Sequence, residues 1–149
     1  MKKIYLLILL LILPGCNGYQ PILSSNNLNF YITDIELLTK NYASKQIKRN
    51  LKPYTKNNDK DGVSLKISST KNEQILSKDK KGDPEVYQMI LKVNIEIDYR
   101  NENSKFSLQE KFSYNNQSNK FEFEQYKKNI EKNLTDIIYQ SLLLRLRSI

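Results

Sequence analysis

Residues 86–100, "VYQMILKVNIEIDYR", constrain the fold more than any other part of the chain. Apolar or aromatic side chains occupy all seven odd positions from 87 to 99, and polar side chains occupy the even positions from 92 to 100. This period of two predicts a long β-strand with one buried face and one face in water. At about 3.3 Å per residue the strand would reach roughly 50 Å. The sheet built around it should therefore keep one face uncovered.

Three further segments alternate in the same way and predict strands: residues 28–33 ("LNFYIT"), residues 63–77, and residues 106–114, where Glu110 interrupts the apolar row. Polar segments at 78–85 ("KDKKGDPE") and 101–104 ("NENS") separate the last three strands and predict turns. Strands joined by short turns should be antiparallel. The sequence leaves open where the first strand pairs.

Two segments have a helical period instead. In residues 41–52 an apolar stripe recurs every four residues, Asn41 can cap the start, and Pro53 marks the end. The stripe consists of Ala43, Ile47 and Leu51, and the basic residues Lys45, Lys48, Arg49 and Lys52 lie mostly off it. A second helix is expected over residues 121–146. Its predicted buried stripe is Tyr126, Ile130, Leu134, Ile137, Ile138 and Leu142, with Lys127, Lys128, Glu131 and Lys132 in solvent.

These elements predict an α+β fold in the order strand, helix, three strands, helix. Two amphipathic helices can cover one face of a sheet, so we expect a two-layer sandwich on a mostly antiparallel four-stranded sheet. A single domain should occupy residues 28–149.

Residues 1–15 have the layout of an export signal. Lys2 and Lys3 form a positive start, residues 4–13 are ten continuous apolar residues, and the small Gly15 precedes Cys16. As a helix, ten residues span about 15 Å, which is half of a bilayer core. We therefore expect a cleaved signal rather than a membrane span.

Cys16 is the only cysteine, so it cannot form a disulfide within the chain. A free thiol or an intermolecular disulfide would be the plain explanations. However, the segment "LPGC" resembles a bacterial lipobox, with Pro14 as a departure from the usual pattern. That resemblance implies diacylglycerol on the thiol, cleavage before Cys16 and acylation of the new amine. Residues 16–27 would then be the lipidated cysteine and its tether, and Asn17, where an Asp would retain the protein at the inner membrane, implies delivery to the outer membrane.

The composition removes several kinds of chemistry. The chain has no histidine, which excludes Ser-His and Cys-His pairs and His/Cys zinc sites, and its four glycines form no phosphate loop. Glu96 and Asp98 could serve a lipid-anchored hydrolase or hold calcium, but a solvated polar face explains them more simply. We expect no enzymatic activity, cofactor, metal or nucleic-acid partner.

The chain is basic, with a net charge of +8. Without Lys2 and Lys3, 22 basic residues still face 16 acidic ones, which favours an anionic partner such as a phosphate-bearing lipid. The 20 lysines against 4 arginines, together with 17 asparagines, equally suggest a compositional bias.

The segments together resemble the lipopolysaccharide-assembly lipoproteins of the LptE family. The resemblance rests on "GCNGYQPIL" at the start, "GVSLKIS", "IEIDYR" and "FSYNNQSNKFEFE" in the middle, and "SLLLRLRSI" at the end. It implies an outer-membrane lipoprotein on the periplasmic face, which plugs the LptD β-barrel, helps it fold and binds lipopolysaccharide. An accessory lipoprotein of phospholipid transport or of β-barrel insertion is the alternative.

Candidate contacts with lipopolysaccharide follow from this resemblance and from charge. They are Lys78, Lys80 and Lys81 in the turn before the long strand, and Arg100 and Lys105 near its other end. We expect the two groups to lie at opposite ends of the sheet.

Overall fold

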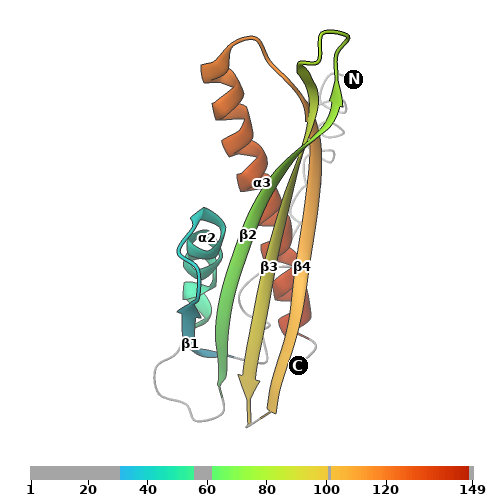
Figure 1. Ribbon diagram of the computed structural model, residues 1–149. Coiled ribbons are helices and arrows are strands. Elements are labelled where there is room, and N and C mark those ends of the chain that lie inside the picture. The colour runs from blue at the N-terminus through green and yellow to red at the C-terminus, as the bar shows by residue number, and fades with distance from the viewer. Residues whose placement is uncertain (1–30, 56–61, 101, 148–149) are drawn as a thin grey trace, which may run out of the picture.

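The computed structural model describes residues 31–55, 62–100 and 102–147 (Figure 1). The elements are β1 (Ile32–Leu37), α2 (Tyr42–Leu51), the 3₁₀ helix η2 (Lys52–Tyr54), β2 (Val63–Lys78), β3 (Pro84–Tyr99), β4 (Glu102–Asn115) and α3 (Lys120–Leu146). This is the predicted α+β fold with two α-helices and four strands. The expected signal segment 1–15, Cys16 and the tether 16–27 lie outside the described residues.

The sheet has the order β1-β2-β3-β4, so every strand lies beside its neighbour in sequence. The strands β2, β3 and β4 are antiparallel, as their short connections require. β1 pairs in parallel with the start of β2, because the chain crosses over through α2 between these two strands. This pairing answers the question that the sequence left open.

The first strand was predicted at residues 28–33 but is observed at Ile32–Leu37. Of the predicted segment, residues 28–30 lie outside the described part of the chain. In β1 the buried side chains are Ile32 and Ile35, and the register shifts between Ile32 and Asp34. A β-bulge adds one residue to a strand and therefore breaks simple alternation. For this reason the period of two did not predict that the strand continues past Thr33 to Leu37.

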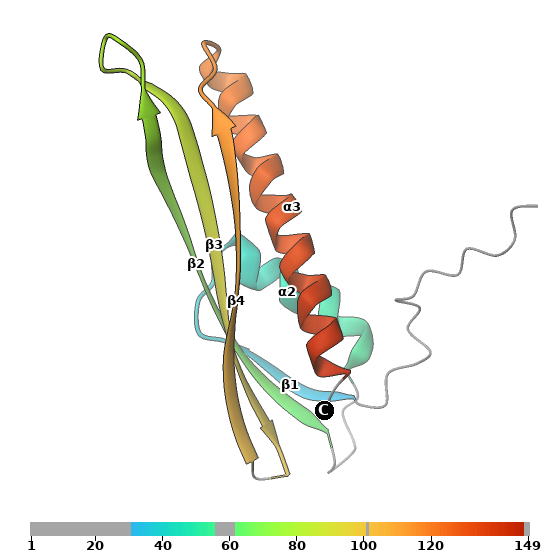
Figure 2. The ribbon, with the colours of Figure 1, turned by 90° about the vertical axis from the view of Figure 1, so that its right-hand side faces the viewer.

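Both helices lie on the same side of the sheet and leave the other side open, as Figure 2 shows. The covered side contributes the odd-numbered residues of β2 and β3, including Leu65, Ile67 and Leu91, which are fully buried. On α2, Ile47 and Leu51 of the predicted apolar stripe are also fully buried. Asn41 caps α2 as predicted, its side chain accepting a hydrogen bond from the backbone N–H of Ser44 at 3.1 Å.

The open side of the sheet is polar along its length. From the strand register it carries Ser64, Lys66, Ser68, Thr70, Asn72 and Gln74 of β2, Gln88, Lys92, Asn94, Glu96 and Asp98 of β3, and Lys105, Ser107, Gln109, Lys111 and Ser113 of β4. Val86 toward the hairpin end of β3 and Ile90 near its middle interrupt this polar surface. The wet strand face predicted from the sequence is therefore the open face of the whole sheet.

The buried face of α3 differs from the prediction at two positions. Ile137 is 46% exposed, whereas Glu131, which was expected in solvent, is only 9% exposed. Glu131 can be buried because the ammonium group of Lys71 on β2 lies 2.6 Å from its carboxylate. Leu143 and Leu146 complete the buried face in place of Ile137.

Four aromatic rings pack together where the first part of α3 meets the sheet. Tyr87 and Tyr114 stack with ring centroids 5.8 Å apart, and Phe123 of α3 lies 5.5 Å from Tyr87. Tyr126 meets the ring of Tyr114 edge-on at 6.1 Å. Such pairs stabilise a fold by about 1 kcal/mol each beyond the area they bury. No helix in the described ranges is long and apolar enough to cross a membrane.

Candidate functional site

The tip of the β2–β3 hairpin holds the first predicted group of basic residues. The Asp79 carboxylate accepts hydrogen bonds from the backbone N–H groups of Lys81 and Asp83, both at 2.9 Å. Gly82 adopts a positive φ of 89°, which a residue with a side chain rarely does, so this glycine permits the turn. The side chains of Lys78, Lys80 and Lys81 are all exposed around it.

The hairpin tip combines charge with apolar surface. Asp79, Asp83 and Glu85 equal the three lysines in number, so the tip carries little net charge. Irregular pairing after Ile75 breaks the alternation, and Ile75 and Leu76 are 46% and 49% exposed. Cationic and apolar groups side by side suit an amphiphilic ligand that bears phosphate groups.

Arg100 and Lys105 lie at the other end of the sheet, as expected. Arg100 forms part of the β3–β4 turn, and its guanidinium lies 5.0 Å from the centre of the Tyr99 ring. The Lys105 ammonium lies 2.9 Å from the carboxylate of Glu96. The 16 residues of β3, roughly 50 Å of strand, separate this pair from the hairpin tip. The five predicted residues therefore do not form one site.

A second basic surface was not predicted as a site. Residues Thr33, Asp34, Ile35, Leu37, Lys45, Lys48, Arg49, Lys52 and Thr55 line a groove of about 600 Å³ between β1 and α2, which we call the basic groove. Three of its cations, Lys45, Lys48 and Arg49, come from α2, and Lys52 follows at the start of η2. At spacings i, i+3, i+4 and i+7 the four form one stripe. That spacing is visible in the sequence. The sequence does not show that β1 lies beside this stripe.

A third groove, of about 660 Å³, lies where α3 meets β2, and its lining carries four lysines and three glutamates. The Lys127 ammonium lies 2.8 Å from Glu124 and 3.6 Å from Glu73. Its hydrogen bond to Glu124 is the main reason why the pKa of Lys127 is raised. The Tyr114 hydroxyl donates to Glu73, and burial, followed by this bond, raises the pKa of Tyr114. Because three glutamates offset all but one of the four lysines here, we interpret this groove as structural.

Comparisons with known proteins give a fold but no sequence family. No protein-family model matches the sequence, and no curated protein matches it as a relative. The fold is similar to rare lipoprotein B from Shewanella oneidensis, with a TM-score of 0.58 at 16% identity over 75% of this chain and 95% of that one. A minor lipoprotein from Acinetobacter baumannii gives a TM-score of 0.61 at 22% identity over 81% of this chain and 95% of that one.

A third solved structure agrees with these two. An uncharacterized lipoprotein B from Nitrosomonas europaea has a TM-score of 0.58 at 14% identity, covering 80% of this chain and 82% of that one. At these identities the likeness establishes the fold. The described domain thus has a two-layer α+β fold that solved bacterial lipoproteins also have.

Proposed function

We propose that this protein is an outer-membrane lipoprotein of lipopolysaccharide assembly, acting as plug and folding partner of an LptD-type β-barrel. The observation that carries the proposal is the shared fold, which spans 95% of two solved structures that are both lipoproteins. The "LPGC" segment supports it independently, because it is local sequence that plays no part in the fold comparison. Lipid on Cys16 would hold the domain at the periplasmic face of the outer membrane.

The shape and polarity of the domain support the plug role. The open sheet face is polar along strands of 14 to 16 residues, which is roughly 45–50 Å. The lumen of a large outer-membrane barrel is also polar, so such a face can lie against its wall with polar groups facing polar groups. In this role the protein binds and positions other molecules, and it needs no catalytic group or cofactor.

The hairpin tip supports a contact with lipopolysaccharide. Exposed Ile75 and Leu76 offer apolar surface for acyl chains, and the neighbouring lysines offer point charges for phosphate groups. The near-neutral total charge of the tip means that such a contact depends on placement rather than on a long-range field.

The test of the main proposal is affinity purification of the tagged protein from detergent-solubilised membranes, with mass spectrometry of its partners. We expect one large outer-membrane β-barrel, and we expect depletion of the protein to reduce lipopolysaccharide at the cell surface. The variant Cys16→Ala should lose labelling by radioactive palmitate and its membrane retention. Recovery of an inner-membrane transporter or of a barrel-insertion complex would favour the alternative lipoprotein role, and unchanged lipopolysaccharide after depletion would refute the proposal.

The lipopolysaccharide contact has its own test. Replacing Lys78, Lys80 and Lys81 together by glutamine should weaken binding of purified lipopolysaccharide by several-fold to about a hundredfold, since each exposed charge contributes about 1 kcal/mol or less. The control replaces Lys66, Lys92 and Lys111 on the open face, which removes the same charge elsewhere. Equal losses in both variants would show that only net charge matters and would remove the tip from the proposal.

A further inference from the structure

The basic groove carries an excess of positive charge that its own surroundings do not neutralise. Four cations face a single carboxylate, Asp34, so the lining has a formal charge of +3. Within the described ranges, no acidic side chain forms an ion pair with any of these cations. Lys48 donates a hydrogen bond to the backbone carbonyl of Ile35, and Arg49 donates to Gln46.

The arrangement on α2 differs from that of an ordinary solvated helix. α2 contains no acidic residue. The helix dipole favours Lys48 and Arg49 in its last turn, but like charges four residues apart, such as Lys45 and Arg49, destabilise a helix. On α3, by contrast, Lys127 pairs with Glu124, and Glu131 pairs with Lys71. A general bias toward lysine would act on both helices. The unopposed stripe on α2 therefore indicates an anionic partner, which would relieve the repulsion.

The position of the groove indicates which partner this is. The chain enters β1 beside the groove, because Ile32 forms a bridge with Thr55, one of the groove residues. Fourteen residues separate Cys16 from Tyr31, and they can span at most about 50 Å. The hairpin tip lies at the opposite end of β2 from β1 (Figure 1). If Cys16 is lipidated, the groove belongs to the end of the molecule that the anchor keeps near the membrane.

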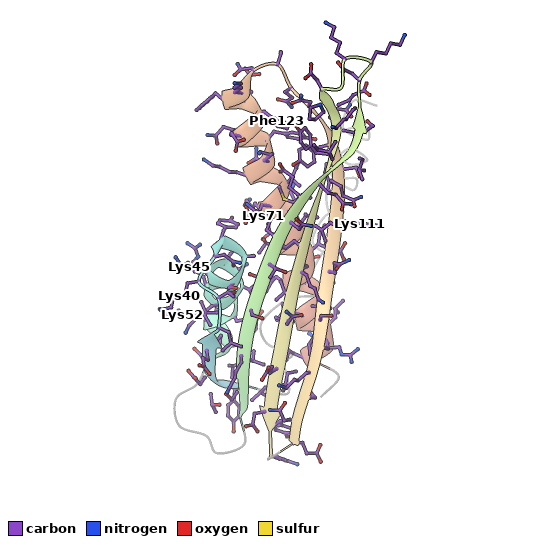
Figure 3. The ribbon with its side chains drawn as sticks, in the orientation of Figure 1. Lys40, Lys45, Lys52, Lys71, Lys111 and Phe123 are labelled. Carbon is purple, nitrogen blue, oxygen red and sulfur yellow. The ribbon has the colours of Figure 1, made fainter. Side chains whose placement is uncertain are left out.

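We propose that the basic groove binds the anionic phospholipid headgroups of the leaflet that holds the lipid anchor. Lys45 of α2 and Lys52 of η2 project at the outer edge of the molecule, where a flat surface can reach them (Figure 3). A basic residue close to an anionic membrane surface strengthens binding about fivefold, and a tether raises the effective concentration of the surface. The contact would hold this end of the domain at the membrane surface, with the hairpin tip at the opposite end of β2. This inference rests on the proposed function, which supplies the anchor.

The test separates the groove from the anchor by using the Cys16→Ala chain from residue 16 onward, which lacks the apolar export segment and has no thiol to carry lipid. We compare its flotation with vesicles of phosphatidylcholine alone and with vesicles that also contain phosphatidylglycerol. Changing Lys45, Lys48, Arg49 and Lys52 to glutamine should weaken binding to the anionic vesicles at least about tenfold and leave the neutral vesicles unaffected. High salt should remove the difference.

A matched control removes four positive charges elsewhere, from Lys92, Lys111, Lys128 and Lys132. It should bind anionic vesicles nearly as well as the parent chain, and circular dichroism should show that all variants are folded. Equal losses in the two variants, displacement by inorganic phosphate at constant ionic strength, or an effect on barrel co-purification with vesicle binding unchanged would each overturn the inference. Palmitate labelling of Cys16 in the wild-type chain fails or succeeds independently of these results.

Discussion

At the scale of single residues, Tyr114 shows how the long hairpin is held against α3. Its hydroxyl donates to Glu73 on β2, and its ring packs between Tyr87, Phe123 and Tyr126. Glu73 also lies 3.6 Å from the Lys127 ammonium. This carboxylate of β2 therefore contacts both β4, through Tyr114, and α3, through Lys127. The sequence identified Tyr87 as a core residue but gave no indication of this carboxylate bridge.

The substitution Tyr114→Phe should lower the free energy of unfolding by about 1 kcal/mol at neutral pH, because it removes the hydrogen bond and keeps the ring. The pKa of Tyr114 is raised above its ordinary value of 10.0 in the folded protein. Its contribution to stability is therefore complete below about pH 10 and is lost as the pH rises further, when the unfolded chain ionises first. Urea titrations at several pH values should show a shallower alkaline decline in the variant.

Tyr42→Phe is the control, because Tyr42 is 42% exposed and lies at the start of α2. Its stability should stay within about 0.5 kcal/mol of the wild type at neutral pH. An identical alkaline decline in the wild type and in Tyr114→Phe would contradict the assignment of the raised pKa.

At the scale of elements, α3 is the helix whose buried face the sequence predicted only in part. Its apolar side chains occupy more positions than one stripe can bury, so periodicity alone did not choose between Ile137 and Ile138. The sheet makes the choice: α3 packs on it through Ile130, Leu134, Ile138 and Leu142, and Glu131 beside them pairs with Lys71. The ends and the buried face of α2 could be predicted from the sequence, since Asn41, Pro53 and a narrow apolar stripe define them locally.

The neighbouring residues Ile137 and Ile138 give a matched pair for this rotation. Ile138 is fully buried, and Ile138→Ala should lower the free energy of unfolding by about 2–5 kcal/mol. Ile137→Ala, at a site 46% exposed, should change it by less than about 1 kcal/mol. Chemical denaturation of both variants measures the difference, and equal losses would show that the helix is rotated differently.

At the scale of the whole molecule, the two faces of the sheet differ in what they contact. One face is covered by the helices and forms the core, and the other remains polar and open (Figure 2). The hairpin tip and the groove beside β1 lie toward opposite ends of the sheet. A domain of this kind can bind one partner along its open face while its ends contact others, as the proposed plug would.

The open face can be tested with a bulky substitution. Ser107 lies on the surface near the middle of this face. Ser107→Trp should therefore keep the free energy of unfolding within about 0.5 kcal/mol of the wild type. We expect the variant to lose co-purification of the barrel. Asn133→Trp, at an exposed position of α3, should retain it. If both variants still co-purify the barrel, the open face is not the contact.

The sequence by itself determined the features that depend on neighbouring residues. Alternation determined which face of β3 is wet, and the apolar stripe of α2 together with Asn41 determined where that helix begins and what it buries. These patterns are reliable because strand and helix geometry place side chains according to sequence spacing alone.

Only the tertiary structure decided the features that depend on residues far apart in the chain. The parallel pairing of β1 with β2, the burial of Glu131 against Lys71 and the groove between β1 and α2 all require segments that the fold brings together. A charge on a helix is solvated, paired or part of a site according to what packs beside it. For this reason the basic residues of α2 were visible in the sequence, but the basic groove became visible only in the structure.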